Sequence, residues 1–63
     1  MNKTVLIVED EIRIRFLVRD YFKKEGFNVL EASDGEEALR IFSENIVDLA
    51  ILDIMMPKLD GLA

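Results

Sequence analysis

Short apolar runs alternate with amphipathic segments along this 63-residue chain, and this alternation is the feature that most restricts its fold. The run 4–8 is apolar and β-branched without polar alternation, which indicates a strand buried on both faces. The segments 28–32 and 49–52 follow it, and each interval leaves room for one helix. The order strand, helix, strand, helix, strand predicts an α/β fold with a parallel sheet.

The segment between the first two strands has helical periodicity. Four of its apolar residues recur at i, i+3, i+4 and i+7, namely Ile14, Leu17, Val18 and Tyr21. This spacing predicts an amphipathic helix over about residues 11–25 that buries these side chains, so Tyr21 is expected in the core. Gly26 follows at the position where a glycine commonly ends a helix.

A second helix is predicted between the second and third strands. Residues 33–36 match the Ser-x-x-Glu capping box, with Ser33 as its first residue and Glu36 as its last. From here a helix can run to about Asn45. We expect three apolar side chains to be buried on it, those of Ala38, Leu39 and Phe42.

Right-handed crossovers between parallel strands leave one simple arrangement of the sheet. The first strand lies in the middle, with the second on one side and the third on the other, so the strand order is 2-1-3. The second strand carries Glu31, which suits an edge position. The third strand is as apolar as the central one, yet nothing within the 63 residues pairs with its far edge. We therefore expect self-association to complete the sheet.

Composition excludes several kinds of chemistry. The chain has no Cys and no His, which rules out disulfides, thiolate nucleophiles, imidazole bases and zinc sites built on these ligands. Its formal net charge of −5 argues against direct binding of nucleic acid, which needs a positive surface. No apolar stretch approaches the ~20 residues of a membrane helix or forms a signal-peptide core, so we expect a cytoplasmic location without membrane contact.

Acidic residues follow two neighbouring strands of the predicted sheet. Glu9 and Asp10 come after the first strand, and Asp53 comes after the third. These strands end where the strand order reverses, so we expect the three acids to converge. Carboxylates ~4 Å apart repel by roughly 4 kcal/mol at an effective dielectric of about 20, and an all-oxygen cluster suits Mg²⁺, Mn²⁺ or Ca²⁺. The alternative is that Glu9 or Asp10 is a solvated loop residue or caps the first helix.

The motifs around these acids, taken together, resemble the receiver domain of bacterial two-component response regulators. The matching segments are residues 5–11, 32–39 and 48–57, with Asp60-Gly61 behind them. The resemblance covers the whole chain in the order and spacing of the family. It implies a flavodoxin-like, doubly wound parallel sheet, of which residues 1–63 would be the N-terminal half, truncated before the third helix.

The resemblance also implies roles for individual residues. Asp53 matches the phosphoacceptor, which takes a phosphoryl group from a histidine kinase. Glu9 and Asp10 match the acidic pair that holds Mg²⁺ together with Asp53. Met55 matches the residue whose backbone carbonyl completes the metal shell. Such a domain is a phosphoprotein of phosphorelay signal transduction rather than an enzyme.

Only the first half of the family's pattern falls within the chain. The serine or threonine of the family's fourth strand and the lysine of its fifth strand have no counterpart in the 63 residues. Removing one preorganised charge donor costs about 10²–10³ in rate, so the fragment alone is expected to be inactive or weak. The alternative is a self-associating structural or engineered half-domain, a homodimer or higher oligomer without activity.

A basic stripe lies on the predicted first helix, where Arg15, Arg19 and Lys23 recur at i, i+4 and i+8. Glu11 stands one turn before Arg15 and is expected to pair with it. The simplest interpretation is a solvated helix face with ion pairs. The resemblance to receiver domains suggests instead a surface that docks the kinase.

Overall fold

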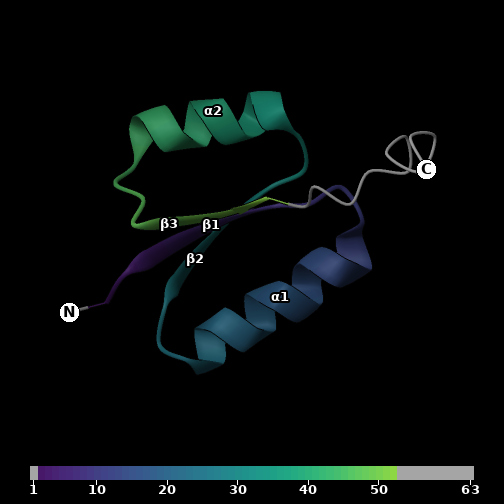
Figure 1. The fold of residues 1–63 in the computed structure, drawn as a ribbon, viewed down its shortest axis with the longest axis vertical. Helices are drawn as coiled ribbons and strands as arrows, with labels where there is room; N and C mark the ends of the chain where they lie inside the picture. Colours follow the sequence, from purple (N-terminus) through teal and green to yellow (C-terminus); the bar gives the residue numbers. More distant parts are fainter. Residues whose placement is uncertain (1, 53–63) are drawn as a thin grey trace, which may run out of the picture.

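The computed structural model describes residues 2–52, and in this part the chain forms a parallel sheet with one helix on each face (Figure 1). The elements are β1 (Thr4–Val8), α1 (Ile12–Lys24), β2 (Asn28–Ala32), α2 (Gly35–Glu44) and β3 (Leu49–Leu52). The strand order is β2-β1-β3, and β1 is parallel to both neighbours. The predicted α/β class, order of elements and strand order are therefore confirmed.

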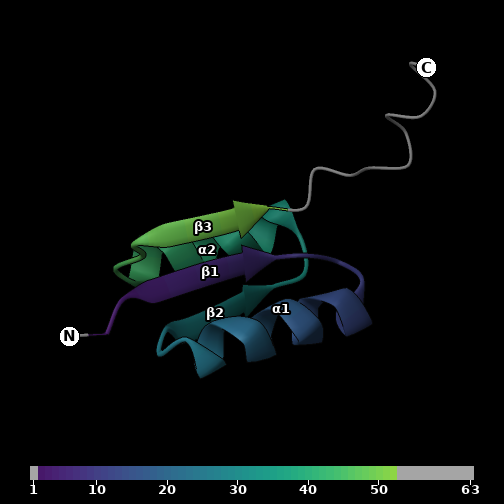
Figure 2. The same cartoon turned by 60° about the horizontal axis from the view of Figure 1, so that its bottom comes forward.

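β1 is the central strand and supplies most of the core. Val5, Leu6 and Ile7 are each no more than 2% exposed. β2 and β3 pair with the two edges of β1, while α1 and α2 pack against β1 and β2 from opposite faces (Figure 2). Because both faces and both edges are covered, no side chain in the middle of the strand reaches water. This is why the run carries no polar alternation.

The end of α1 is formed as its sequence predicts. Gly26 has a φ of 93°, a left-handed conformation that glycine adopts without steric cost. The Gly26 amide donates to the Lys23 carbonyl and the Phe27 amide donates to the Phe22 carbonyl, each at 3.0 Å. The Phe22 and Phe27 rings meet edge to face, with centroids 5.1 Å apart. These bonds and this apolar contact together form a Schellman motif, which turns the chain from α1 into β2.

The face of α1 that turns toward the sheet differs from the predicted one. Its partly buried residues are Arg15, Val18, Arg19 and Phe22. Leu17 is 71% exposed and Tyr21 is also exposed, so the prediction that Tyr21 is a core residue is wrong for the described structure. The reason is that α1 packs over β2 and β1 and, within residues 2–52, touches neither β3 nor α2.

α2 differs from the prediction in the same way. Ala38 and Ile41 are half-buried, whereas the predicted core residues Leu39 and Phe42 are exposed. Within residues 2–52, α2 contacts β1 and β2 but not β3. Both helices therefore keep an apolar side that no described element covers. Neither helix of this part of the chain has the length and apolar character to cross a bilayer.

β3 lies at the edge of the described sheet. At its amino end, the Thr4 amide donates to Asp48 Oδ2 (2.7 Å) and the Asp48 amide donates to the Thr4 carbonyl (2.9 Å). At its carboxyl end, Leu52 lies opposite Val8. Leu49 and Leu52 are exposed. Within residues 2–52, β3 is thus an apolar strand with one unpaired edge, as the sequence predicts.

The position of the core can be tested with one substitution at two sites. Ile7 is 1% exposed, so Ile7→Ala should lower the free energy of unfolding by about 2–5 kcal/mol or leave the chain unfolded. Ile46 is 87% exposed, so Ile46→Ala should change the free energy of unfolding by less than about 0.5 kcal/mol. Urea unfolding followed by circular dichroism measures both. Equal effects at the two sites would contradict a core centred on β1.

Candidate functional site

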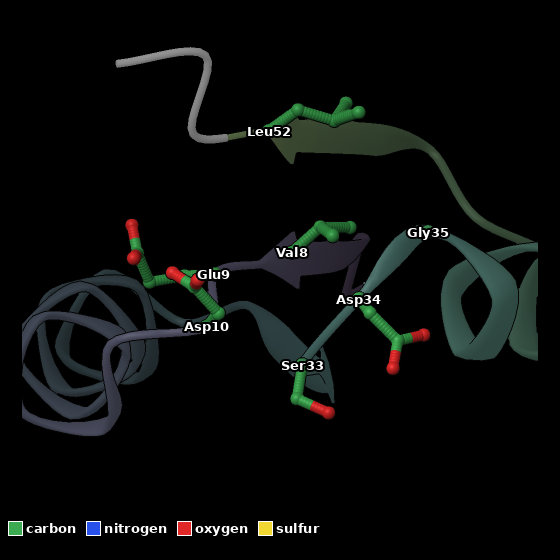
Figure 3. A pocket seen from close by; sticks show the side chains of 7 residues that line it. All are labelled: Val8, Glu9, Asp10, Ser33, Asp34, Gly35 and Leu52. Atoms are coloured by element: carbon green, nitrogen blue, oxygen red, sulfur yellow. The ribbon is translucent and has the colours of Figure 1, made fainter. Parts of the chain in front are cut away.

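A pocket of about 290 Å³ opens at the carboxyl ends of the strands (Figure 3). One wall is formed by Val8 at the end of β1 and by the following residues Glu9 and Asp10. Leu52 at the end of β3 lines a second side, and residues 33–35, before and at the start of α2, line a third. Parallel pairing brings these ends together, because strands that run the same way finish at the same edge of the sheet.

Glu9 is a buried acid at this edge. It is 6% exposed, and its Oε2 accepts a hydrogen bond from the Glu11 amide at 3.0 Å. The Glu9 amide donates to the Ala32 carbonyl at the end of β2, also at 3.0 Å. The backbone and the side chain of Glu9 are thus each held by a hydrogen bond. Such a carboxylate has a fixed position, which a ligand of a metal ion requires.

Asp10 stands beside Glu9 and is exposed. Figure 3 shows the carboxylates of Glu9 and Asp10 pointing to one side of the loop after β1, whereas the side chains of Ser33 and Asp34 point the other way. The N-cap of α1 is Glu11, whose carboxylate accepts from the Arg13 amide. Neither Glu9 nor Asp10 therefore occupies the capping position that the sequence left open as an alternative.

The donor set at this edge fits a hard divalent cation. Glu9 and Asp10 offer carboxylate oxygens on the same side of the pocket, one buried and one open to water, and Mg²⁺ commonly binds one or two carboxylates and keeps several waters. Among residues 2–52, no group of three acids is placed to hold a metal ion. The predicted site residues Asp53 and Met55 lie outside the described residues.

The opposite wall of the pocket is the N-terminus of α2, and its cap lies one residue later than predicted. The N-cap is Asp34, whose carboxylate accepts from the Glu37 amide at 2.8 Å. Glu37 Oε1 in turn accepts from the Ser33 amide (2.8 Å) and the Ser33 hydroxyl (2.9 Å). The predicted box between Ser33 and Glu36 is therefore wrong by one position. The sequence suits either choice, because aspartate also caps helices well and a glutamate stands three residues after Ser33 and again three residues after Asp34.

Arg15 is a residue of this site that the sequence analysis missed. Its Nη1 donates to the Glu9 carbonyl at 3.0 Å, and its Nε donates to Glu31 Oε1 at 3.0 Å. The predicted pair between Glu11 and Arg15 is wrong, since Glu11 pairs with Arg13 at 3.7 Å. The signal that could have revealed this arrangement is Glu31, the one charged residue of β2, in a strand next to the helix that carries Arg15.

Glu37 gives the α2 cap a pH dependence that can be measured. The hydrogen bond from the Ser33 backbone amide, followed by that from the Ser33 hydroxyl, lowers the pKa of Glu37 below its usual value of 4.5. A depressed folded-state pKa contributes stability above the unfolded value that is lost as pH falls through the folded value. Glu37→Gln should therefore flatten the fall of melting temperature between about pH 6 and pH 3. Glu36→Gln, which changes an exposed side chain on the same turn, should retain that fall. The same dependence of melting temperature on pH in both variants would contradict this role of Glu37.

Comparison with known proteins agrees with this geometry. The family model for the response regulator receiver domain matches residues 5–63. The response regulator GtcR of Aneurinibacillus migulanus is 48% identical over 61 residues, which are 97% of this chain and 25% of that protein. The probable transcriptional regulator ycf27 of Guillardia theta is 54% identical over 60 residues, 95% of this chain and 24% of the relative.

A third relative is the alkaline phosphatase synthesis transcriptional regulatory protein PhoP of Bacillus subtilis (strain 168), 47% identical over 62 residues. The match covers 98% of this chain and 26% of PhoP, so the chain spans about a quarter of the length of the curated relatives it matches. No solved structure matches the chain significantly. With 59 of its 63 residues matched by the family model, the chain belongs to the response regulator receiver domain family.

Proposed function

We propose that this chain is the phosphoacceptor half of a receiver domain, with Asp53 as the residue that accepts the phosphoryl group. Receiver domains are phosphoacceptor signalling domains, and response regulators partner with histidine kinases. The observation that supports the proposal is the pocket at the carboxyl ends of β1 and β3. Glu9 and Asp10 line it from one strand, and Leu52 lines it as the residue directly before Asp53 in the sequence.

The proposed reaction moves one phosphoryl group from nitrogen to oxygen. A carboxylate oxygen of Asp53 attacks the phosphorus of a phosphohistidine in the kinase, the P–N bond breaks, and an acyl phosphate forms. The departing imidazole nitrogen keeps the bonding electron pair and takes up a proton. The chain's own task is to position the acceptor and to balance charge, because phosphoryl transfer depends mainly on these two effects.

Charge balance requires a cation at the acidic edge. Glu9, Asp10 and Asp53 would hold Mg²⁺ with their carboxylates, and Met55 would add its backbone carbonyl. When bound, Mg²⁺ offsets the negative charge of the carboxylates and of the phosphoryl oxygens. The burial of Glu9 and its hydrogen bond from the Glu11 amide hold one ligand in place before the cation arrives.

The proposed role is that of a signalling module rather than an enzyme. On the family likeness we place it in the cytoplasm, with a histidine kinase as partner. The formal net charge of −5 argues against direct contact of this segment with nucleic acid. The family's fourth-strand hydroxyl and fifth-strand lysine positions lie beyond residue 63, so the 63 residues alone should accept phosphate slowly.

A phosphate mimic tests this function. Addition of Mg²⁺ and beryllofluoride should shift the amide NMR signals of Glu9, Asp10 and Leu52, and Asp53→Asn should abolish the shifts. Asp20→Asn is the matched control, since the exposed Asp20 carboxylate pairs with Arg19 on α1 and does not line the pocket. It should leave the shifts in place. A wild-type chain that shows no metal-dependent response would favour a structural half-domain without activity.

The apolar surfaces left uncovered support a second proposal, self-association through β3. We infer that β3 pairs with β3 of a second copy around a two-fold axis, which gives a six-stranded sheet of order 2-1-3-3′-1′-2′ with antiparallel central strands. Leu49 and Leu52 on β3, Leu39 and Phe42 on α2, and Leu17 on α1 are exposed in the single chain. An apolar strand with an unpaired edge is prone to this kind of pairing.

Sedimentation measures this association. The unmodified chain should sediment as a dimer at micromolar concentration, and Leu49→Lys should convert it to a folded monomer, because a charged side chain on an edge strand opposes pairing. Ile46→Lys, just outside β3, is the control and should remain dimeric. A folded monomer of the unmodified chain at the same concentration would contradict this proposal without affecting the phosphoacceptor role.

A further inference from the structure

One cationic side chain connects α1, β2 and the acidic edge. Arg15 lies in the first turn of α1, and its side chain is only 15% exposed. Its guanidinium donates to the Glu9 carbonyl from Nη1 and to Glu31 Oε1 from Nε, each at 3.0 Å. The planar, forked shape of the guanidinium permits both bonds at once. Three separate parts of the chain therefore meet at one side chain.

We propose that Arg15 is a positioning residue of the cation site, which fixes the backbone of Glu9 so that the Glu9 and Asp10 carboxylates keep their places. This inference rests on the proposed function, in which those carboxylates hold Mg²⁺. Glu9 is then fixed at three points, by its amide to Ala32, by its carbonyl to Arg15 and by its carboxylate to the Glu11 amide. Replacing a group that orients a metal ligand commonly weakens metal binding by about 10- to 100-fold.

The charge of Arg15 does not explain its place beside a cation site. A positive side chain near Mg²⁺ weakens binding by repulsion. Here Glu31 lies 3.0 Å from Arg15 Nε, with a second contact of 4.0 Å to Arg19, so a carboxylate balances the guanidinium locally. With its charge balanced, Arg15 acts on the site through its hydrogen bond to the Glu9 carbonyl, which holds the Glu9 backbone in place. A positioning role and a purely electrostatic role therefore predict opposite effects when Arg15 is replaced.

Arg19 offers a matched control one turn further along α1. It is also partly buried, with its side chain 25% exposed, and it shares Glu31 with Arg15. Arg19 also pairs with Asp20 (2.9 Å) and lies over the ring of Phe16, whose centroid is 4.2 Å from Arg19 Cζ. Replacing Arg19 thus disturbs the ion pairs between α1 and β2 while leaving the Arg15 bond to the Glu9 carbonyl in place.

Mg²⁺ affinity of the 63-residue chain tests the inference. Titration followed by the amide NMR signals of Asp10 and Glu11 should show binding about 10- to 100-fold weaker in Arg15→Met than in the unmodified chain. Arg15→Lys keeps the charge but not the fork, and it should also bind more weakly, by about tenfold or more. Arg19→Met should bind within about twofold of the unmodified chain. This pattern would separate positioning from a general loss of stability.

Other outcomes overturn the inference. Unchanged or tighter Mg²⁺ binding by Arg15→Met would show that the side chain acts by charge alone or not at all on the site. Equal weakening in Arg15→Met and Arg19→Met would show that only the ion pairs between α1 and β2 matter. If Arg15→Met does not fold, Arg15→Lys decides, with unchanged affinity overturning the inference. Absence of Mg²⁺ binding by the unmodified chain would overturn the proposed metal site itself, and this inference with it.

Discussion

The parallel pairing of β1 with both of its neighbours is the constraint on which the other features depend. It buries the middle of β1 and places one crossover helix on each face of the sheet. It also makes β1 and β3 finish at the same edge, with Val8 opposite Leu52. The acids that follow β1 are therefore brought to the edge where β3 ends. An antiparallel β3 would have ended at the other edge of the sheet.

Local signals in the sequence were sufficient for the elements of the fold and their order. The β-branched run of β1, the capping residues and Gly26 each act within a few positions along the chain, so they can be read without knowledge of the tertiary structure. Strand order followed from the handedness of crossovers, which is a general property of parallel sheets. Glu9 and Asp10 were likewise located from their position directly after a buried strand.

The side of each helix that faces the sheet could not be predicted from periodicity alone. The apolar stripe of α1 includes Leu17 and Tyr21, but the helix turns Arg15, Arg19 and Phe22 toward β2 instead. A periodic pattern shows which residues share a helix face but not which partner covers that face. Arg15 was missed for the same reason, because its two acceptors belong to other elements of the structure and only the tertiary packing brings them within reach.

The reciprocal hydrogen bonds between Thr4 and Asp48 have a consequence at the far end of the sheet. They fix the alignment of β3 against β1 directly before the first residue of β3, which is only four residues long. A shift by one residue would exchange the two faces of the strand and move its last residue by about 3.3 Å. The distance between the end of β3 and the carboxylates after β1 is thus determined where the strand begins. Changes in the connection between α2 and β3 can therefore alter the geometry of a site that they never touch.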